Sequence, residues 1–195
     1  KTITTIPTKR FISDPFKNYR GMQESGGRRI KRAIYLDQTS VRFLSPDEIA
    51  RLQRFLLLGQ YLSSKQSELL SWNAELAEAA QEPANTRRVT NIGTFRAYVE
   101  LYLRQHRGIN QNMTLLVRQL QPTADGLPME LYCFTNTVAW AAYEGYQSDI
   151  FDHLLAILPE FGLRVFQHPS GADMRELRPN LHAPAQAANA AQLPS

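Results

Sequence analysis

Residues with catalytic or metal-binding side chains are few in this sequence, and they are scattered. The four histidines are His106, His153, His168 and His182. Only His153 has an acidic residue on the same helical face, Asp149, four positions earlier. One such pair is typical of a surface hydrogen bond, whereas a metal site needs three or four converging ligands. We therefore expect no metal site.

Cys133 is the one cysteine, and it lies in an alternating apolar segment. This pattern is typical of a buried small side chain rather than a reactive thiol, and a single cysteine excludes an intramolecular disulfide. The sequence contains no G-x-S-x-G motif, no phosphate-binding loop and no dinucleotide-binding motif. We therefore predict that the chain is not an enzyme and needs no cofactor.

The strongest local charge feature is the run Arg28-Arg29-Ile30-Lys31-Arg32. Residues 1–40 carry nine Lys and Arg residues against three Asp and Glu residues, although the net charge of the 195-residue chain is only +4. In a strand, Arg28 and Arg32 would lie on one face and Arg29 and Lys31 on the other. Two interpretations follow: an edge strand that charges protect against aggregation, or a surface that lines an ion-filled space.

Hydrophobic patterning from residue 28 onward predicts an α+β domain. Strands are expected at residues 28–36, 113–121, 129–135 and 163–167, and helices at 94–106 and 139–158. Without a helical insertion at about 45–80, the order is βαββαβ, the ferredoxin-like arrangement. Right-handed connections then place both helices on one face of a four-stranded antiparallel sheet.

Three segments make up the predicted organisation. Residues 1–27 are interpreted as the C-terminal part of a truncated β domain, because residues 2–6 alternate and are rich in β-branched side chains. The chain begins at Lys1 without a Met, so we expect it to be a fragment. Residues 28–170 form the αβ domain. Residues 171–195 are expected to be a disordered tail, since residues 179–195 carry no charge and no apolar periodicity.

The insertion has a clear helix start. Ser45 can cap the helix, Pro46 suits the first helical position, and Glu48 can complete a capping box. Gly59 either separates two helices or weakens one long helix. The apolar stripe expected to be buried comprises Ile49, Leu52, Phe55, Leu56, Tyr61, Leu62, Leu69, Trp72 and Leu76. In the helix at 139–158, the residues expected to point inward are Trp140, Tyr143, Ile150, Leu154 and Ile157.

Ferredoxin-like folds include RNA-recognition modules, which stack bases on aromatic residues of the sheet. Tyr35, Tyr132 and Phe134 are the aromatic residues that the predicted strands offer. However, the basic-glycine-aromatic signature of those modules is absent. Aromatic residues in strands are more often packing residues, so RNA binding is the weaker alternative.

Several stretches together resemble a family of membrane proteins. The run Thr2-Ile3-Thr4-Thr5-Ile6-Pro7-Thr8 resembles the closing strands of the small, Sm-like β domain of small-conductance mechanosensitive (MscS-like) channels. The αβ unit over residues 28–167 is similar to the cytoplasmic αβ domain of that family. Residues 17–32, 91–98 and 150–155 resemble the miniconductance branch more closely. Thr8 stands where the common family pattern has Asn, and the insertion fits the miniconductance branch but not the short members.

This resemblance implies the cytoplasmic portion of a mechanosensitive ion channel. Transmembrane helices N-terminal to Lys1 would hold the full protein in the bacterial inner membrane, with this fragment on the cytoplasmic side. Seven identical subunits would surround a pore and form a hollow vestibule, and membrane tension would open the pore and release ions and solutes after hypoosmotic shock. Arg28, Arg29, Lys31 and Arg32 would then contribute to the electrostatics of the ion pathway.

No nucleic-acid partner is expected on this interpretation, and no cofactor is implied. The alternative from another class is a soluble ferredoxin-like module that binds RNA or protein. The two differ in what precedes Lys1, because a channel needs several apolar helices there and a free module needs none.

Overall fold

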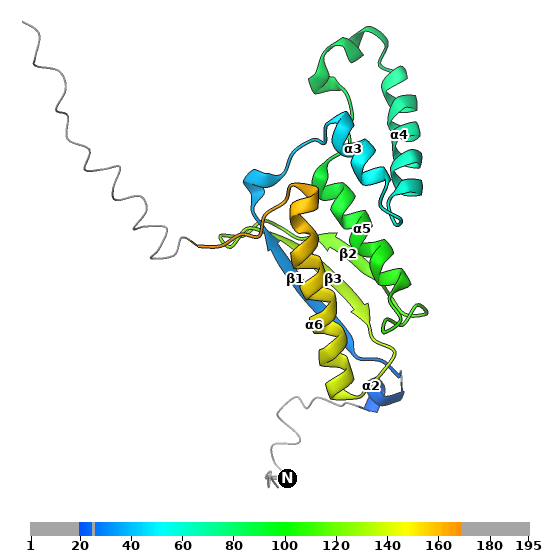
Figure 1. Cartoon of the computed structure of the whole chain (residues 1–195), viewed down its shortest axis with the longest axis vertical. Coiled ribbons are helices and arrows are strands. Elements are labelled where there is room, and N and C mark those ends of the chain that lie inside the picture. The colour runs from blue at the N-terminus through cyan, green and yellow to red at the C-terminus, as the bar shows by residue number, and fades with distance from the viewer. Residues whose placement is uncertain (1–19, 25, 169–195) are drawn as a thin grey trace, which may run out of the picture.

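The computed structural model describes residues 20–24 and 26–168. The predicted strand at residues 2–6 and the predicted tail at 171–195 lie outside the described residues. A short helix, α2 (Arg20–Glu24), precedes the sheet. The described part is an α+β structure, in which helices pack on an antiparallel sheet and a helical insertion projects from one end (Figure 1).

The sheet has three strands: β1 (Arg29–Leu36), β2 (Leu116–Gln119) and β3 (Leu127–Phe134). Their order is β1-β3-β2, and both pairings are antiparallel, with Arg29 opposite Phe134 and Leu116 opposite Tyr132. A turn at residues 123–126 joins β2 and β3. Gly126 has a φ of +102°, a conformation that glycine adopts without a steric penalty.

The fourth predicted strand, at residues 163–167, is reduced to a single bridge between Leu36 and Val165. The Asp37 amide donates to the Arg164 carbonyl at 2.8 Å, and the Phe166 amide donates to the Tyr35 carbonyl at 2.9 Å. The prediction of a full strand was therefore wrong for the described residues. Residues 163–167 run beside only the last residues of β1, so the pairing between the two segments is limited to this one bridge.

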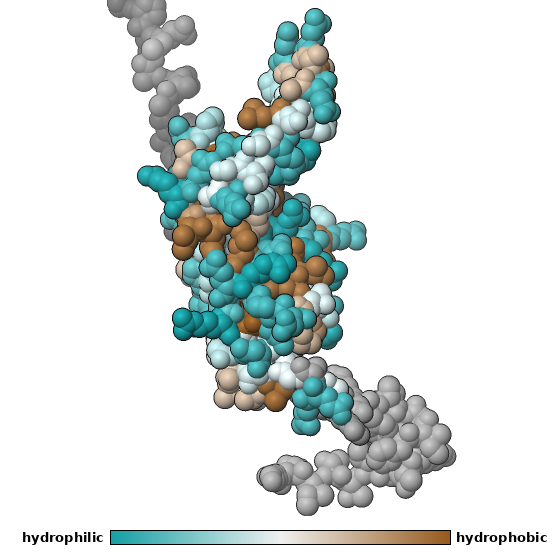
Figure 2. Space-filling model, turned by 90° about the vertical axis from the view of Figure 1, so that its right-hand side faces the viewer, coloured by the Kyte–Doolittle hydropathy of each residue, from teal (hydrophilic) through white to brown (hydrophobic). Residues whose placement is uncertain are grey.

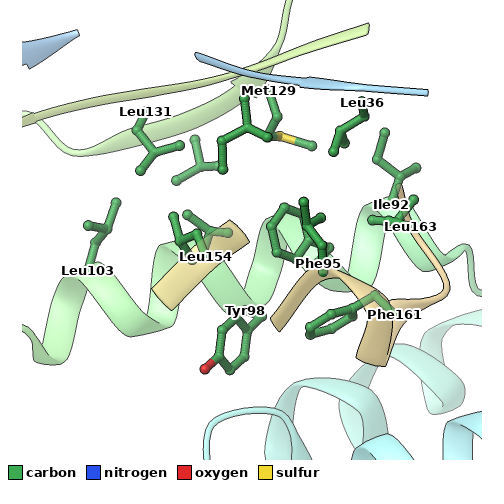
Figure 3. Packing of buried hydrophobic residues seen from close by; sticks show 14 of the residues in the cluster. Leu36, Ile92, Phe95, Tyr98, Leu103, Met129, Leu131, Leu154, Phe161 and Leu163 are labelled. Carbon is green, nitrogen blue, oxygen red and sulfur yellow. The ribbon is translucent and has the colours of Figure 1, made fainter. Parts of the chain in front are cut away.

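Helices α5 (Asn91–Gln105) and α6 (Trp140–Ile157) cover the same face of the sheet (Figure 1). Thr90 caps α5, because its hydroxyl accepts a hydrogen bond from the Gly93 amide at 3.2 Å. Figure 3 shows the core between the two layers, where side chains of α5 and α6 meet those of the strands. Its members from the strands and the two helices include Ile30, Ile34, Leu36, Phe95, Val99, Leu103, Met129, Leu131, Cys133, Ile150 and Leu154.

The insertion is helical, as predicted. A 3-10 turn, η1 (Gln38–Ser40), leads into α3 (Pro46–Gln53), which is followed by α4 (Gly59–Ala74) and the 3-10 turns η2 (Ala77–Gln81) and η3 (Pro83–Asn85). The capping box of Ser45 and Glu48 is present. Gly59 begins α4, so the alternative of two separate helices is the observed one. Figure 2 shows the insertion as a narrow projection from the rest of the structure.

Three apolar residues expected to be buried are instead exposed. Leu56 is 94% exposed, because residues 54–58 form turns and the helical spacing is broken there. Trp72 is 37% exposed, with the Arg87 guanidinium 5.4 Å from its ring. Trp140 is 62% exposed at the start of α6, where the Arg28 guanidinium covers it.

Phe161 connects the insertion to the main core. It lies in η4 (Leu158–Phe161), directly after α6. Its ring is 5.2 Å from that of Phe95 and 5.4 Å from that of Tyr98, both on α5. It is also 6.2 Å from the ring of Phe55 in the insertion. One buried side chain therefore contacts both parts of the structure. Within the described residues, no helix has the length and apolar character that crossing a membrane would require.

Candidate functional site

Strand β1 positions the basic run that the sequence singled out. The Arg32 guanidinium lies 4.3 Å from the ring of Phe151 on α6, and the Arg28 guanidinium lies 4.5 Å from the ring of Trp140. Both cations therefore lie on the face of the sheet that the helices cover. Arg29 lies on the opposite face, with its guanidinium 5.8 Å from the ring of Tyr132 on β3.

The described residues leave the charge of the four cations on or beside β1 uncompensated. None of Arg28, Arg29, Lys31 and Arg32 forms an ion pair with any residue in the described part of the chain. Lys31, Arg29 and Arg32 are exposed, and Arg28 is partly buried. Aromatic rings beside three of these cations hold the guanidinium groups in place without neutralising them. This part of the chain therefore presents a concentration of positive charge to solvent.

Among the described residues, β1 is an outer strand of the sheet, flanked only near Leu36 by the Val165 bridge. Charges on such an edge protect it from pairing with other chains. The same exposed cations would also attract anions from solution. Both interpretations of the basic run therefore rest on the same geometry.

The face of the sheet opposite α5 and α6, on which the described residues place no helix, carries aromatic residues. Tyr132 and Phe134 meet edge to face at 5.7 Å, and Tyr35 is 42% exposed on the neighbouring strand. Leu116 on β2 is 47% exposed beside them. The aromatic residues weighed for RNA binding are therefore on one face, although the first two form a perpendicular pair rather than a flat platform.

An ion pair on this face was not predicted. Arg118 on β2 donates to Glu130 on β3 from Nε at 2.9 Å and from Nη2 at 2.7 Å. The two residues are opposite each other in the strand register, and only 7% of the Glu130 side chain is exposed. Their opposite charges on predicted neighbouring strands were the available signal, but the register that pairs them was not known from sequence.

His153 does not pair with Asp149. Its Nε2 is instead 2.8 Å from the Tyr98 hydroxyl, and its ring stacks on that of Tyr102 at 4.6 Å. No cluster of three or more metal-ligating side chains occurs within residues 20–24 and 26–168. Burial raises the pKa of the Cys133 thiol to about 12, which leaves it protonated and unreactive at neutral pH.

A groove of about 550 Å³ lies where the insertion meets the chain before and after it. Its apolar lining includes Phe43, Ile49, Leu69 and Leu70, and Leu70 is 71% exposed. The Arg88 guanidinium lies 3.8 Å from the ring of Phe43 at its rim. The apolar stripe of the insertion therefore packs in part and remains open in part.

Comparison with known proteins shows what part of the chain is similar to. Residues 75–165 match the family described as Mechanosensitive ion channel MscS, C-terminal. This range contains α5, β2, β3, α6 and η4, whereas β1 and most of the insertion precede it. This match confirms, over residues 75–165, the resemblance to the MscS-like channels seen in the sequence. That family is one of ion channels, in agreement with the expectation of a non-enzyme.

A curated relative supports the same conclusion. The chain is 32% identical over 71 residues to the "Low conductance mechanosensitive channel YnaI" of Escherichia coli (strain K12). The alignment covers 36% of this chain and 21% of the relative. The chain therefore spans about a fifth of the length of the channel that it matches.

Proposed function

We propose that this chain is the cytoplasmic vestibule portion of a mechanosensitive channel of the miniconductance branch. In this proposal the full protein opens under membrane tension and releases ions and solutes after hypoosmotic shock. The observation that carries the proposal is the family match over residues 75–165, and the similarity to a low conductance mechanosensitive channel supports it.

The arrangement of the sheet supports a ferredoxin-like domain at residues 28–170. The order β1-β3-β2, with the Val165 bridge at the free edge of β1, is the strand order of a βαββαβ fold. Both long helices cover one face of the sheet, as that fold requires (Figure 1). In the proposal, residues 1–27 complete an Sm-like β domain and residues 171–195 are a disordered tail.

The proposed assembly is a homoheptamer in the bacterial inner membrane. Transmembrane helices outside this sequence would anchor it, and this chain would lie on the cytoplasmic side. Identical subunits in a closed ring meet through two different surfaces, each subunit offering one surface to its left neighbour and the other to its right. No cofactor and no nucleic acid form part of the proposed function.

Fractionation of native host cells with an antibody against this chain tests the proposal. We expect a band well above 22.2 kDa in the inner membrane fraction, followed by tension-activated currents from that membrane in patch-clamp recordings. A band near 22.2 kDa in the soluble fraction would contradict the channel function.

In the proposal, Arg28, Arg29, Lys31 and Arg32 raise the local concentration of anions near the ion pathway. The double variant Arg29→Glu/Lys31→Glu should therefore shift the reversal potential toward cation preference at low salt, and the shift should shrink as salt is added. Arg54→Glu/Arg96→Glu is the matched control, because both residues are exposed, lie at the end of α3 and in α5 rather than on β1, and form no ion pair with a described residue. An equal shift in the two variants, or no shift, would remove the β1 cations from the pathway.

A soluble binding module for RNA or protein is the second candidate. The exposed Tyr35 and Leu116 on the face without helices are the observation that favours it. RNA binding through that face would weaken steeply with salt. Salt-sensitive RNA binding by the chain, together with a soluble 22.2-kDa band in the host, would select this candidate.

A further inference from the structure

A second cavity lies where the C-terminal end of α5 meets α6. It has a volume of about 450 Å³, within the range of small-molecule sites. Three parts of the chain line it: Leu57 from the insertion, Tyr102 and residues 105–108 at the end of α5 and in the turn after it, and Tyr146 and Asp149 of α6. We call it the α5–α6 cavity. It is separate from β1 and from the face of the sheet without helices.

Three aromatic rings form its walls. The His106 ring is 5.8 Å from that of Tyr102 at an angle of 57°, and 5.9 Å from that of Tyr146 at 80°. Rings at these distances and angles contact one another at an edge, and all three residues belong to the lining of the cavity. One partner fixes Tyr102 from outside the cavity, because the His153 ring stacks on it at 4.6 Å and 15°. Aromatic walls of this kind attract cations through the negative charge on ring faces.

His106 is held as a neutral ring. Its Nδ1 accepts a hydrogen bond from the Gly108 amide at 3.1 Å, which requires that this nitrogen carry no proton. Burial lowers the pKa of His106, and the nearby Asp149 carboxylate opposes this effect. A neutral imidazole completes an aromatic wall, whereas an imidazolium would repel a cation.

Gly108 lets the Tyr146 ring pack closely against the turn after α5. A Cβ atom at position 108 would lie 2.7 Å from the Tyr146 ring, well inside van der Waals contact. The ring therefore packs directly on the backbone of the turn after α5. Replacing Gly108 by a larger residue would displace this wall.

Two opposite charges at the cavity have no partner within the described part of the chain. The Asp149 carboxylate forms neither a hydrogen bond nor an ion pair there, and neither does the Arg107 guanidinium. Both line the same cavity, yet they form no ion pair with each other. The carbonyl end of the α5 dipole adds negative potential near the rings. The cavity thus offers a site for a cation and, separately, a site for an anion.

We propose that the α5–α6 cavity binds a small zwitterion, with a methylated ammonium group against the rings and Asp149 and a carboxylate at Arg107. A methylated ammonium is weakly hydrated, so aromatic walls can replace its water shell. The guanidinium of Arg107 can bind a carboxylate through two parallel hydrogen bonds. This proposal does not depend on the channel function.

Titration of the chain with trimethylglycine, followed through the Gly108 amide and the Tyr102 and Tyr146 rings by NMR, tests this inference. We expect saturable shifts at these positions. The carbon analogue 3,3-dimethylbutanoate has the same shape without the positive charge, and choline has the ammonium without the carboxylate. Both should bind roughly fivefold more weakly, or worse. Equal binding of the carbon analogue, or the absence of saturable shifts, would overturn the proposal.

Matched variants test whether the two charged side chains, Asp149 and Arg107, contribute to binding. Asp149→Asn and Arg107→Gln should each weaken trimethylglycine binding roughly fivefold. Asp152→Asn and Arg96→Gln change residues that are also exposed but lie outside the cavity, and they should leave the affinity unchanged. Gly108→Ala should abolish binding while the far-ultraviolet circular dichroism stays native. Equal losses in the cavity variants and the control variants would refute the site.

Discussion

At the scale of single residues, Glu130 is the most deeply buried charged residue of the sheet. Its carboxylate is largely shielded from solvent, and Arg118 supplies two hydrogen bonds to one of its oxygens. A buried charge that loses its partner keeps its desolvation penalty. The pair therefore contributes to stability mainly by preventing that penalty.

We expect Arg118→Ala to lower the free energy of unfolding by about 3 kcal/mol, because it leaves the Glu130 carboxylate uncompensated. The double variant Arg118→Met/Glu130→Leu should recover most of this loss, since it removes both charges and keeps apolar volume. Urea denaturation of the two variants measures the difference. A loss below about 0.5 kcal/mol in Arg118→Ala would show that water compensates the carboxylate.

Glu48 provides a pH-dependent contribution to stability. Its pKa is lowered from 4.5 to about 2, first by the hydrogen bonds from Arg42 and then by the Ser45 amide. The folded chain therefore stabilises the ionised form more than the unfolded chain does. This contribution is fully present above pH 4.5 and is lost as the pH falls toward 2.

We expect the thermal midpoint of unfolding to fall more steeply with acidification in the native chain than in Glu48→Gln, between pH 4.5 and 2. Glu75→Gln is the control, because Glu75 is exposed and lies outside the capping box. Parallel pH curves for the native chain and Glu48→Gln would contradict this assignment.

At the scale of elements, the insertion shows how local geometry overrides a helical stripe. Leu52 and Leu56 are four positions apart and would share a helical face. α3 ends at Gln53, so Leu52 is fully buried whereas Leu56 is 94% exposed. These two leucines of the same insertion therefore differ widely in their contribution to stability.

Leu52→Ala should lower the free energy of unfolding by about 3 kcal/mol through lost burial and the cavity it leaves. Leu56→Ala should change it by less than about 0.5 kcal/mol. Chemical denaturation of both variants under the same conditions provides the comparison. Similar losses for the two would mean that α3 and α4 form one continuous helix in solution.

At the scale of the whole molecule, Phe161 couples the insertion to the αβ core. Its ring contacts Phe95 and Tyr98 on α5 and Phe55 in the insertion. The residue lies more than a hundred positions after Phe55, so this contact exists only in the folded chain. Loss of the ring should affect the two parts unequally.

We expect Phe161→Leu to increase amide hydrogen exchange in α3 and α4 more than in β3, because the insertion loses a ring contact that the sheet does not share. Phe43→Leu, at a residue that is 45% exposed, should leave this exchange ratio unchanged. Exchange followed by mass spectrometry gives both values. A uniform increase over all elements would indicate global destabilisation instead of uncoupling.

Much of the fold could be predicted because its signals are local. The capping box of Ser45 and Glu48, the alternation in β1 and β3 and the turn at Gly126 each depend on residues close in sequence. The two faces of the basic run follow from the period of a strand, and the structure confirms them. The family resemblance rested on such local runs as well.

The tertiary structure alone decided which apolar residues are buried and which charges meet. It left Leu56 and Trp140 in solvent and paired Arg118 with Glu130 across a strand register. It also brought Tyr102 and Tyr146 to one cavity from two helices that are far apart in sequence. These outcomes depend on the relative placement of whole elements, which comes from packing over long sequence separations. Periodicity can give the face of a residue within its own element, but it cannot give the partner that this face will contact.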